Sequence, residues 1–443
     1  AYAASAICSN SRLALSTGRY QNRWGGYWYG EGGMPTAEKT IAEMMKEAGY
    51  ATMKVGKTHL NYGPREHPLD HGFDQFLGFI KPAWDFFLLS QKDVDAYENK
   101  KKGFAPRTAS SFGPLTRNRA KESFENTSTT EVFGDESVKF ITANKEKSFY
   151  LQLELNAVHT PLHQAPPQLE KKYGIPQLKF DRDAKVWEYP FWDPVVQPDY
   201  KEWYGQTCHL KKMDPYGRKK YLAHLELMDQ VIGNIMDALK KYNLDENTFI
   251  FFSSDNGGSH QSYANNGELN VYKYCLMEGG IKVPMVISWP SKFMPTRTDA
   301  VVTHRDLFAT LSDITGITPK NELDGKSLIP LVTGQVDELH PEPLMWDSGP
   351  KQKNWVVRQG DWKLVFRGTP RMYKAYELDE QGLVTKFVST QIPQGLQLYK
   401  LADDPGERNN LVDQYPEKVA AMEKSYTNWR SQMMDPLPGH KAK

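Results

Sequence analysis

Short apolar strands alternate with amphipathic helices along most of this chain, and this alternation constrains the fold more than any other feature. The helical patterns repeat apolar residues at three- and four-residue spacing, and the first of them stops at Gly49. These criteria predict helices over 35–49, 221–241 and 306–316, and strands over 50–55, 149–156, 248–252 and 283–289. Strands separated by helices favour an α/β fold. We therefore predict a large mixed, mostly parallel sheet sandwiched by helices.

The pattern changes from about residue 334 onward. Strand patterns over 355–358 and 362–366 flank Gly360 as a hairpin, and a further strand (396–401) and a closing helix (416–434) follow. At 443 residues the chain is long enough for two domains. We predict a catalytic α/β domain over 1–333 and a smaller C-terminal α+β subdomain over 334–443.

Charge and composition exclude several classes of partner. The formal net charge is +1 with 25% charged residues, so we expect no binding to nucleic acid or to a membrane surface. No apolar run approaches the length of a membrane span. The three cysteines are too few for a disulfide scaffold. If Cys8 is a nucleophile, Cys208 and Cys275 either pair or remain free thiols.

Polar residues follow several predicted strands directly. They are Lys57, His59, His159, Asp255 and Asn256. Ligands of α/β sheets bind beyond the carboxyl ends of the strands, so these side chains are expected to share one site. The Asp-Asn pair offers the oxygen ligands that calcium requires, although such a run is also common in turns.

A cysteine precedes the first short helical stretch of the chain. Cys8 stands at its start, Arg12 follows on the next turn, and Gly18 can end the helix. Backbone N–H groups at a helix start attract anions and favour a thiolate. The residues therefore indicate a nucleophile in an anion-binding niche, and the plain alternative is a buried cysteine before an ordinary helix.

The segment Cys8-Ser9-Asn10-Ser11-Arg12, followed by Thr17-Gly18-Arg19, resembles the motif of the type I sulfatases, which belong to the alkaline phosphatase superfamily. The resemblance implies that a formylglycine-generating maturation enzyme oxidises Cys8 to formylglycine, whose hydrate attacks sulfur. Asn10 departs from the family, which has proline or sometimes alanine there. Family members also carry a pair of metal-binding aspartates upstream of this motif, so we expect that this chain lacks its beginning and any signal peptide.

Further segments resemble the same family in order and spacing. They are Gly56-Lys57-Thr58-His59-Leu60, Asn156-Ala157-Val158-His159-Thr160-Pro161, Ser254-Asp255-Asn256-Gly257, and Lys273 ahead of Glu278-Gly279-Gly280. The resemblance implies that Arg12, Lys57 and Lys273 bind sulfate, that His59 orients or deprotonates the nucleophile, and that His159 protonates the leaving alcohol. It also implies a calcium ion bound by Asp255, Asn256 and the oxidised Cys8.

Aromatic and charged residues outside these motifs are expected to select the substrate. The candidates are Trp84, Asp85, Trp187 and Trp192, which suit stacking on sugar rings or, equally, packing of an insertion. The resemblance implies a calcium-dependent sulfatase acting on a sulfated polysaccharide or derived oligosaccharide, in the periplasm or secreted. The alternatives are a phosphonate or phosphodiester hydrolase of the same superfamily and an inactive protein that binds sulfated glycans.

Overall fold

A mixed five-stranded sheet forms the centre of the molecule. The computed structural model describes residues 1–61, 65–82, 84, 86, 114–124, 127–160, 162, 165–176, 180–181, 186–187 and 213–437. The sheet has the order β4 (Ala120–Glu122), β3 (Leu115–Arg117), β2 (Gln75–Phe79), β1 (Ala51–Lys57) and β5 (Phe149–Glu154). Strand β1 is parallel to β2 and β5, whereas β2–β3 and β3–β4 are antiparallel. The predicted mixed α/β sheet is confirmed.

Two glycines allow the three parallel strands to approach closely near their carboxyl ends. Gly56 pairs with Gly78 on one side and with Glu154 on the other. A Cβ on Gly56, at φ +100°, would lie 2.2 Å from the carbonyl oxygen of Glu154, and one on Gly78 would lie 1.9 Å from that of Gly56. This packing fixes the position at which Lys57 leaves the sheet.

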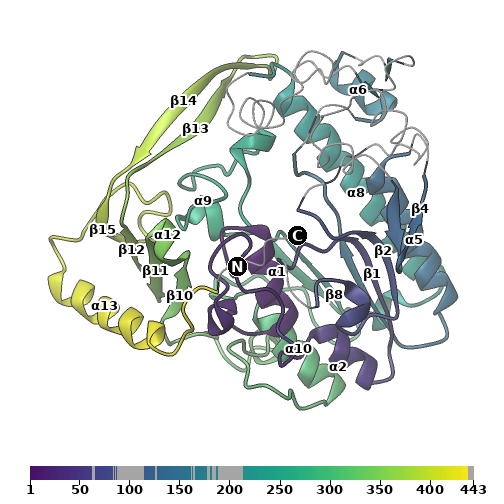
Figure 1. Cartoon of the computed structure of the whole chain (residues 1–443), viewed down its shortest axis with the longest axis horizontal. Coiled ribbons are helices and arrows are strands. Elements are labelled where there is room, and N and C mark those ends of the chain that lie inside the picture. Colours follow the sequence, from purple (N-terminus) through teal and green to yellow (C-terminus); the bar gives the residue numbers. More distant parts are fainter. Residues whose placement is uncertain are drawn as a thin grey trace.

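Helices cover both faces of the sheet (Figure 1). Helix α5 (Thr129–Ala143) packs Val132, Phe133 and Phe140 against Met53 and Val55 of β1. The other face is covered by α2 (Ile41–Glu47) and α10 (Asp306–Thr315), whose apolar side chains form one cluster. Successive side chains of β1 point to opposite faces of the sheet, so the strand lies between two hydrophobic clusters.

The helices differ from the predicted ranges mainly at their starts. Helix α2 begins at Ile41 rather than residue 35, because the Thr40 side chain accepts the Glu43 N–H while the Glu43 carboxylate accepts the Thr40 N–H. The helix predicted over 221–241 begins earlier, at the start of α8 (Gly217–Lys241). No helix in the described ranges has the length and apolar character needed to cross a membrane.

The remaining elements connect or flank these layers. Strands β8 (Ile250–Ser253) and β9 (Met285–Ser288) pair antiparallel beside α1 (Cys8–Thr17). The short elements are η1 (Gln21–Trp24), η2 (Pro68–Asp70), α6 (Pro167–Tyr173), β6 (Phe180–Asp181), β7 (Val186–Trp187), η3 (Asp245–Asn247), η4 (His260–Ser262), α9 (Glu278–Ile281), α11 (Ile329–Val332) and α12 (Gly349–Gln352). Cys208 lies outside the described residues.

The C-terminal subdomain contains an antiparallel sheet at the left of Figure 1. Its order is β10 (Leu344–Asp347), β11 (Asn354–Gln359), β12 (Trp362–Arg367) and β15 (Gly395–Lys400), and α13 (Pro416–Arg430) packs on one face. The hairpin β13 (Arg371–Leu378)–β14 (Val384–Ile392) reaches back to the N-terminal α/β part, where the Tyr376 hydroxyl donates to the Tyr263 carbonyl at 2.6 Å. The predicted boundary at 333/334 stays a prediction.

Candidate functional site

Cys8 is the first residue of α1 and is almost fully buried, at 1% exposure. The helix ends as predicted at Gly18, which has φ +68° and donates its N–H to the Ala14 carbonyl. Arg12 lies one turn after Cys8 and is also buried. The start of the helix therefore places a thiol and a guanidinium together inside the protein.

The structure brings the predicted catalytic residues to this thiol. Lys273 Nζ lies 2.8 Å from Cys8 Sγ. His59, His159 and Lys57 also act on the ionisation of this thiol. Lys57 ends β1, and His59 follows it in the left-handed backbone region, with φ +47°. The structure therefore brings Lys57, His59, His159 and Lys273 together around Cys8, and their roles stay predictions.

Buried cations control ionisation in this pocket. Burial opposes ionisation of Cys8, but Lys273, Lys57 and the two histidines outweigh it and lower the pKa of the thiol well below its usual range. Burial lowers the pKa of Lys57 to about 8 and that of His59 to about 4. It also lowers the pKa of His159, with help from Lys273 and Lys57. Both imidazoles are therefore neutral near pH 7.

Arg12 is fixed by carboxylates on either side. Its Nε donates to Asp255 Oδ2 at 2.8 Å, and its Nη1 donates to Glu154 Oε2 and, at 3.1 Å, to the Lys57 carbonyl. Lys54 Nζ lies 2.9 Å from the same Glu154 oxygen. Burial opposes the charge on Arg12, but Glu154 and Asp255 outweigh it and raise its pKa. The guanidinium thus stays charged in one orientation.

Sequence reasoning missed Lys54 and Glu154. A signal was present, because each is a charged side chain inside a predicted apolar strand. Their strands are neighbours, and the register pairs Gly56 with Glu154 and Lys54 with Gln152. A buried charge inside a strand needs a partner, so the two should have been paired with one another.

A buried histidine that the sequence analysis did not consider connects α1 to β8. His304 Nδ1 lies 3.1 Å from Ser11 Oγ, and its Nε2 lies 3.0 Å from Ser253 Oγ. Burial lowers the pKa of His304 to about 4, so the ring is neutral. It fixes the helix that carries Cys8 to the strand that leads to Asp255.

Asp255 and Asn256 fit two positions of a calcium site. The Asn256 Oδ1 atom is buried and has no hydrogen-bond partner, as expected for an oxygen that ligates a cation. Asp255 offers its carboxylate but already accepts from Arg12. Calcium takes six to eight oxygens, whereas no group of three or more His, Cys, Asp or Glu side chains able to hold a metal occurs among the described residues. The described residues thus supply only part of such a site.

Asn10 has a defined role in the fold despite its departure from the family motif. It is fully buried, and its Oδ1 accepts from Asn61 Nδ2 at 3.0 Å and from Ser9 Oγ at 3.3 Å. Asn61 Nδ2 also donates to the Glu31 carbonyl at 2.7 Å. Asn10 therefore connects the Cys8 helix to the turn before Glu31, a link that proline could not make.

Of the four predicted substrate-binding residues, the structure describes the side chain of Trp84 alone. Trp84 is buried with 9% exposure and stacks on Phe79, at 5.4 Å between ring centroids, in the cluster under α5. Asp85 and Trp192 lie outside the described residues. Trp187 ends β7, of which the backbone alone is described. Their contact with substrate stays a prediction, and the position of Trp84 favours packing.

Family models match most of the chain. A model described as Sulfatase matches residues 1–317, and one described as N-sulphoglucosamine sulphohydrolase, C-terminal, matches residues 267–386. These matches cover the Cys8 motif, the Lys57, His159 and Asp255 segments, and much of the C-terminal subdomain. The family predicted from the sequence motifs is confirmed.

Named relatives and solved structures agree with these matches. The chain is 27% identical over 451 residues to N-acetylgalactosamine-6-sulfatase of Canis lupus familiaris, covering 92% of this chain and 73% of that protein. It is 28% identical over 400 residues to arylsulfatase of Hemicentrotus pulcherrimus, covering 86% of this chain and 62% of that protein. The crystal structure of Ps i-CgsB in complex with k-i-k-neocarrahexaose has a TM-score of 0.74 at 26% identity, covering 100% of this chain and 86% of that one.

Proposed function

Because the chain belongs to the sulfatase family, we propose that it hydrolyses sulfate esters of a sulfated carbohydrate and releases inorganic sulfate. The observation that carries the proposal is the set of buried cations around Cys8, namely Arg12, Lys57 and Lys273. A sulfate group placed beside Cys8 would meet these cations in a pocket shielded from water. The named sulfatases among its relatives favour this reaction over phosphonate or phosphodiester hydrolysis.

The three cations would bind the transferring group and stabilise the charge that develops on it. Lys273 is already 2.8 Å from the position of the nucleophile, and Lys57 is held beside it at the end of β1. Arg12 is fixed by Glu154 and Asp255, so it needs no reorganisation during the reaction. Preorganised charge of this kind usually contributes more to catalysis than any other single effect.

The two histidines would move protons. His59 is neutral at pH 7, so it can accept the proton of a nucleophilic hydroxyl at residue 8. His159 would donate a proton to the leaving alcohol oxygen. Lys273 and Lys57 lower the pKa of His159, and bound sulfate would offset their charge and favour the protonated ring.

We propose that the family cofactors complete this site. Formylglycine, made from Cys8 by a maturation enzyme, supplies a hydrated aldehyde oxygen as nucleophile, and calcium supplies positive charge to it and to sulfate. Asp255 and Asn256 would hold the ion, and the orphaned Asn256 Oδ1 supports this assignment. A sulfated polysaccharide as substrate also favours a periplasmic or secreted location.

The test is a screen of defined substrates with protein from its native host. N-acetylgalactosamine 6-sulfate, sulfated carrageenan oligosaccharides and a phosphodiester are each incubated with the protein, and free sulfate is measured by ion chromatography. We expect sulfate release from at least one saccharide, with the lost position located by NMR, and a mass spectrum in which Cys8 is formylglycine. Phosphodiester cleavage without sulfate release would favour the alternative hydrolase, and an unmodified Cys8 with binding alone would favour a glycan-binding protein.

A further inference from the structure

Two tyrosines lie beside the residues that surround Cys8. The Tyr29 ring stacks on His59, with centroids 6.0 Å apart and planes at 16°, and its side chain is 38% exposed. Tyr274 lies 6.2 Å from Tyr29 between ring centroids, next to Lys273, whose ammonium is 5.6 Å from the Tyr274 ring. The two rings therefore adjoin the proposed proton acceptor on one side and a proposed sulfate-binding lysine on the other.

The backbone holds Tyr274 in an unusual conformation. Its φ is +75°, a region that a bulky side chain rarely adopts. The Tyr274 N–H donates to the Ala6 carbonyl at 2.9 Å, and its hydroxyl donates to Gln261 Oε1 at 3.3 Å. Strained backbone is maintained where surrounding contacts fix it, and it concentrates at ligand sites. The ring is thereby fixed relative to Cys8, which directly follows Ala6 and Ile7.

The turn that carries Tyr29 is tied to the helix of the nucleophile. Asn61 Oδ1 accepts from the Gly30 N–H at 3.3 Å, and Asn61 Nδ2 donates to the Glu31 carbonyl and to Asn10 Oδ1. The Trp28 N–H donates to the Glu31 carboxylate at 3.0 Å. Asn10 is two residues from Cys8, so the nucleophile and Tyr29 share one hydrogen-bonded framework. Such a framework preorganises an exposed ring for binding.

We propose that Tyr29 and Tyr274 form an aromatic wall that binds the pyranose ring carrying the scissile sulfate. The proposal rests on the proposed function and assigns the substrate contact of the same site. A pyranose presents C–H groups on its faces and hydroxyls on its edges, whereas a tyrosine offers an apolar face and a polar tip. With sulfate at Lys57 and Lys273, the attached sugar would leave the pocket past these two rings.

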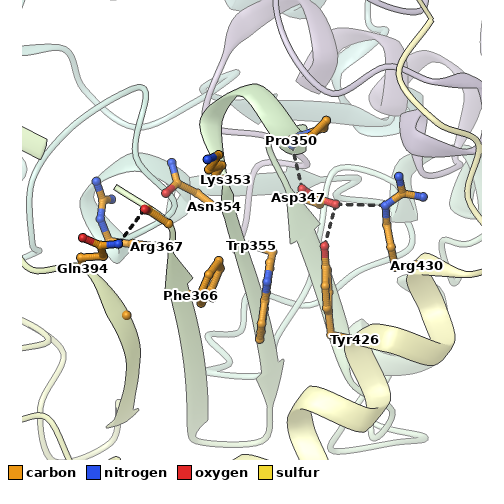
Figure 2. A pocket seen from close by; sticks show the side chains of 13 residues that line it. Asp347, Pro350, Lys353, Asn354, Trp355, Phe366, Arg367, Gln394, Tyr426 and Arg430 are labelled. Atoms are coloured by element: carbon orange, nitrogen blue, oxygen red, sulfur yellow. Dashed lines mark hydrogen bonds and ion pairs between the residues drawn. The ribbon is translucent and has the colours of Figure 1, made fainter. Parts of the chain in front are cut away.

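An aromatic cavity in the C-terminal subdomain is a weaker candidate for binding a sugar ring. It has a volume of about 520 Å³, and Figure 2 shows Trp355 between Phe366 and Tyr426. Trp355 stacks on both rings, at 5.5 Å and 4.1 Å between centroids, so both of its faces are covered. Asp347 accepts from the Tyr426 hydroxyl at 2.9 Å and pairs with Arg430 at 3.6 Å. Packing within the protein already accounts for these groups.

The proposed aromatic wall is tested by measuring saccharide affinity in a variant that cannot hydrolyse the substrate. In the full chain carrying Cys8→Ala, calorimetry measures Kd for N-acetylgalactosamine 6-sulfate, for a sulfated carrageenan hexasaccharide and for inorganic sulfate. We expect Tyr29→Ala and Tyr274→Ala each to raise the Kd for the saccharide that the parent binds more tightly by about fivefold or more. This is the size of one lost aromatic contact. Inorganic sulfate, which needs the cations alone, should keep its affinity within about twofold.

Two control variants keep the test decisive. Tyr29→Phe retains the ring and should bind the saccharide nearly as the parent does. Tyr415→Ala removes an exposed tyrosine (42%) next to α13 and should change neither affinity. An unchanged saccharide Kd in Tyr29→Ala, or an equal loss for saccharide and sulfate, would overturn the wall while leaving the proposed function in place. A parent protein that binds sulfate but no saccharide would overturn both.

Discussion

The residues around Cys8, here called the pocket, and the junction between the two parts of the molecule both bury charged side chains, but the charges balance differently in the two places. At the junction, Lys363 of β12 lies 2.8 Å from both Glu278 and Glu407, and Glu278 also accepts from the Tyr2 hydroxyl at 2.6 Å. The Glu407 carboxylate accepts the Glu278 N–H at 2.7 Å. Both carboxylates, Glu278 and Glu407, thus pair with groups of the protein itself. We therefore do not expect this junction cluster to bind a ligand.

The pocket instead gathers more cations than carboxylates. Among the residues that the structure describes, four buried cations, Arg12, Lys54, Lys57 and Lys273, face two carboxylates, Glu154 and Asp255. Even if Cys8 is ionised, these described groups together carry a net charge of +1. The comparison teaches that burial of charge alone does not identify a site: the junction cluster holds the fold together, whereas the uncompensated charge of the pocket suits an anionic substrate.

Removing a charge from the junction cluster should cause the largest of the expected effects, a loss of folding stability. Lys363→Met removes the cation between two buried carboxylates, and loss of one partner of a buried pair costs about 3–5 kcal/mol. We expect the free energy of unfolding in urea to fall by that amount, while the affinity for inorganic sulfate at the remaining folded fraction stays unchanged. The double variant Lys363→Met/Glu407→Gln should recover part of the stability. A loss of sulfate affinity in Lys363→Met would contradict the separation of the two clusters.

Breaking the pocket should instead affect ligand binding and catalysis. Lys273→Ala removes the cation nearest to residue 8, and we expect kcat/KM for a saccharide sulfate to fall by about a hundredfold, as for loss of one preorganised charge contact. Stability should change less than activity, because the variant also removes a like charge that lowers the pKa of Lys57. Lys282→Ala is the matched control, since Lys282 lies nearby in the chain but is exposed. Equal activity of the two variants would refute the role of Lys273.

A smaller effect is expected from loosening Arg12 without removing it. Glu154→Gln keeps the shape but removes the charge that holds Arg12 and Lys54. A guanidinium free to reorient should lower kcat by about tenfold with little change in KM. Glu154→Asp keeps the charge on a shorter side chain, so it should recover part of the rate if charge matters more than exact position. An unchanged kcat in Glu154→Gln would show that Asp255 alone fixes Arg12.

The contrast also explains what could be predicted from the sequence. The residues around Cys8 stand at strand ends and helix starts, so local patterns and motif spacing predict that Lys57, His59 and His159 lie close together, as they do in the structure. A charged residue inside an apolar strand indicates that Glu154 needs a partner. No local pattern identifies Arg12 as a partner of Glu154, or Lys363 as a partner of Glu278. Tyr29 was missed for a similar reason, because its place beside His59 depends on the Asn61 hydrogen bonds.

The start of α2 shows the same limit at the level of secondary structure. Helical periodicity extended the prediction back to residue 35, but the reciprocal hydrogen bonds between Thr40 and Glu43 set the start at Ile41. A Thr-x-x-Glu pattern was visible in the sequence and could have placed it. Trp84, chosen for its chemistry, lies in the core because β2 and α5 enclose it, which composition does not report.

The smallest expected effect is the pH dependence of the junction. Burial raises the pKa of Glu407 from 4.5 to about 7, despite the opposing charge of Lys363. The folded protein therefore keeps a proton that the unfolded chain has released, so this contribution to stability is full below pH 4.5 and is lost as pH rises through about 7. In Glu407→Gln the side chain stays neutral, so the Tm of the wild type should fall relative to the variant by about 2 °C or more between pH 5 and pH 8. Parallel Tm profiles, measured by differential scanning fluorimetry, would mean that Lys363 keeps Glu407 ionised throughout, and the junction would then be a fully charged triad.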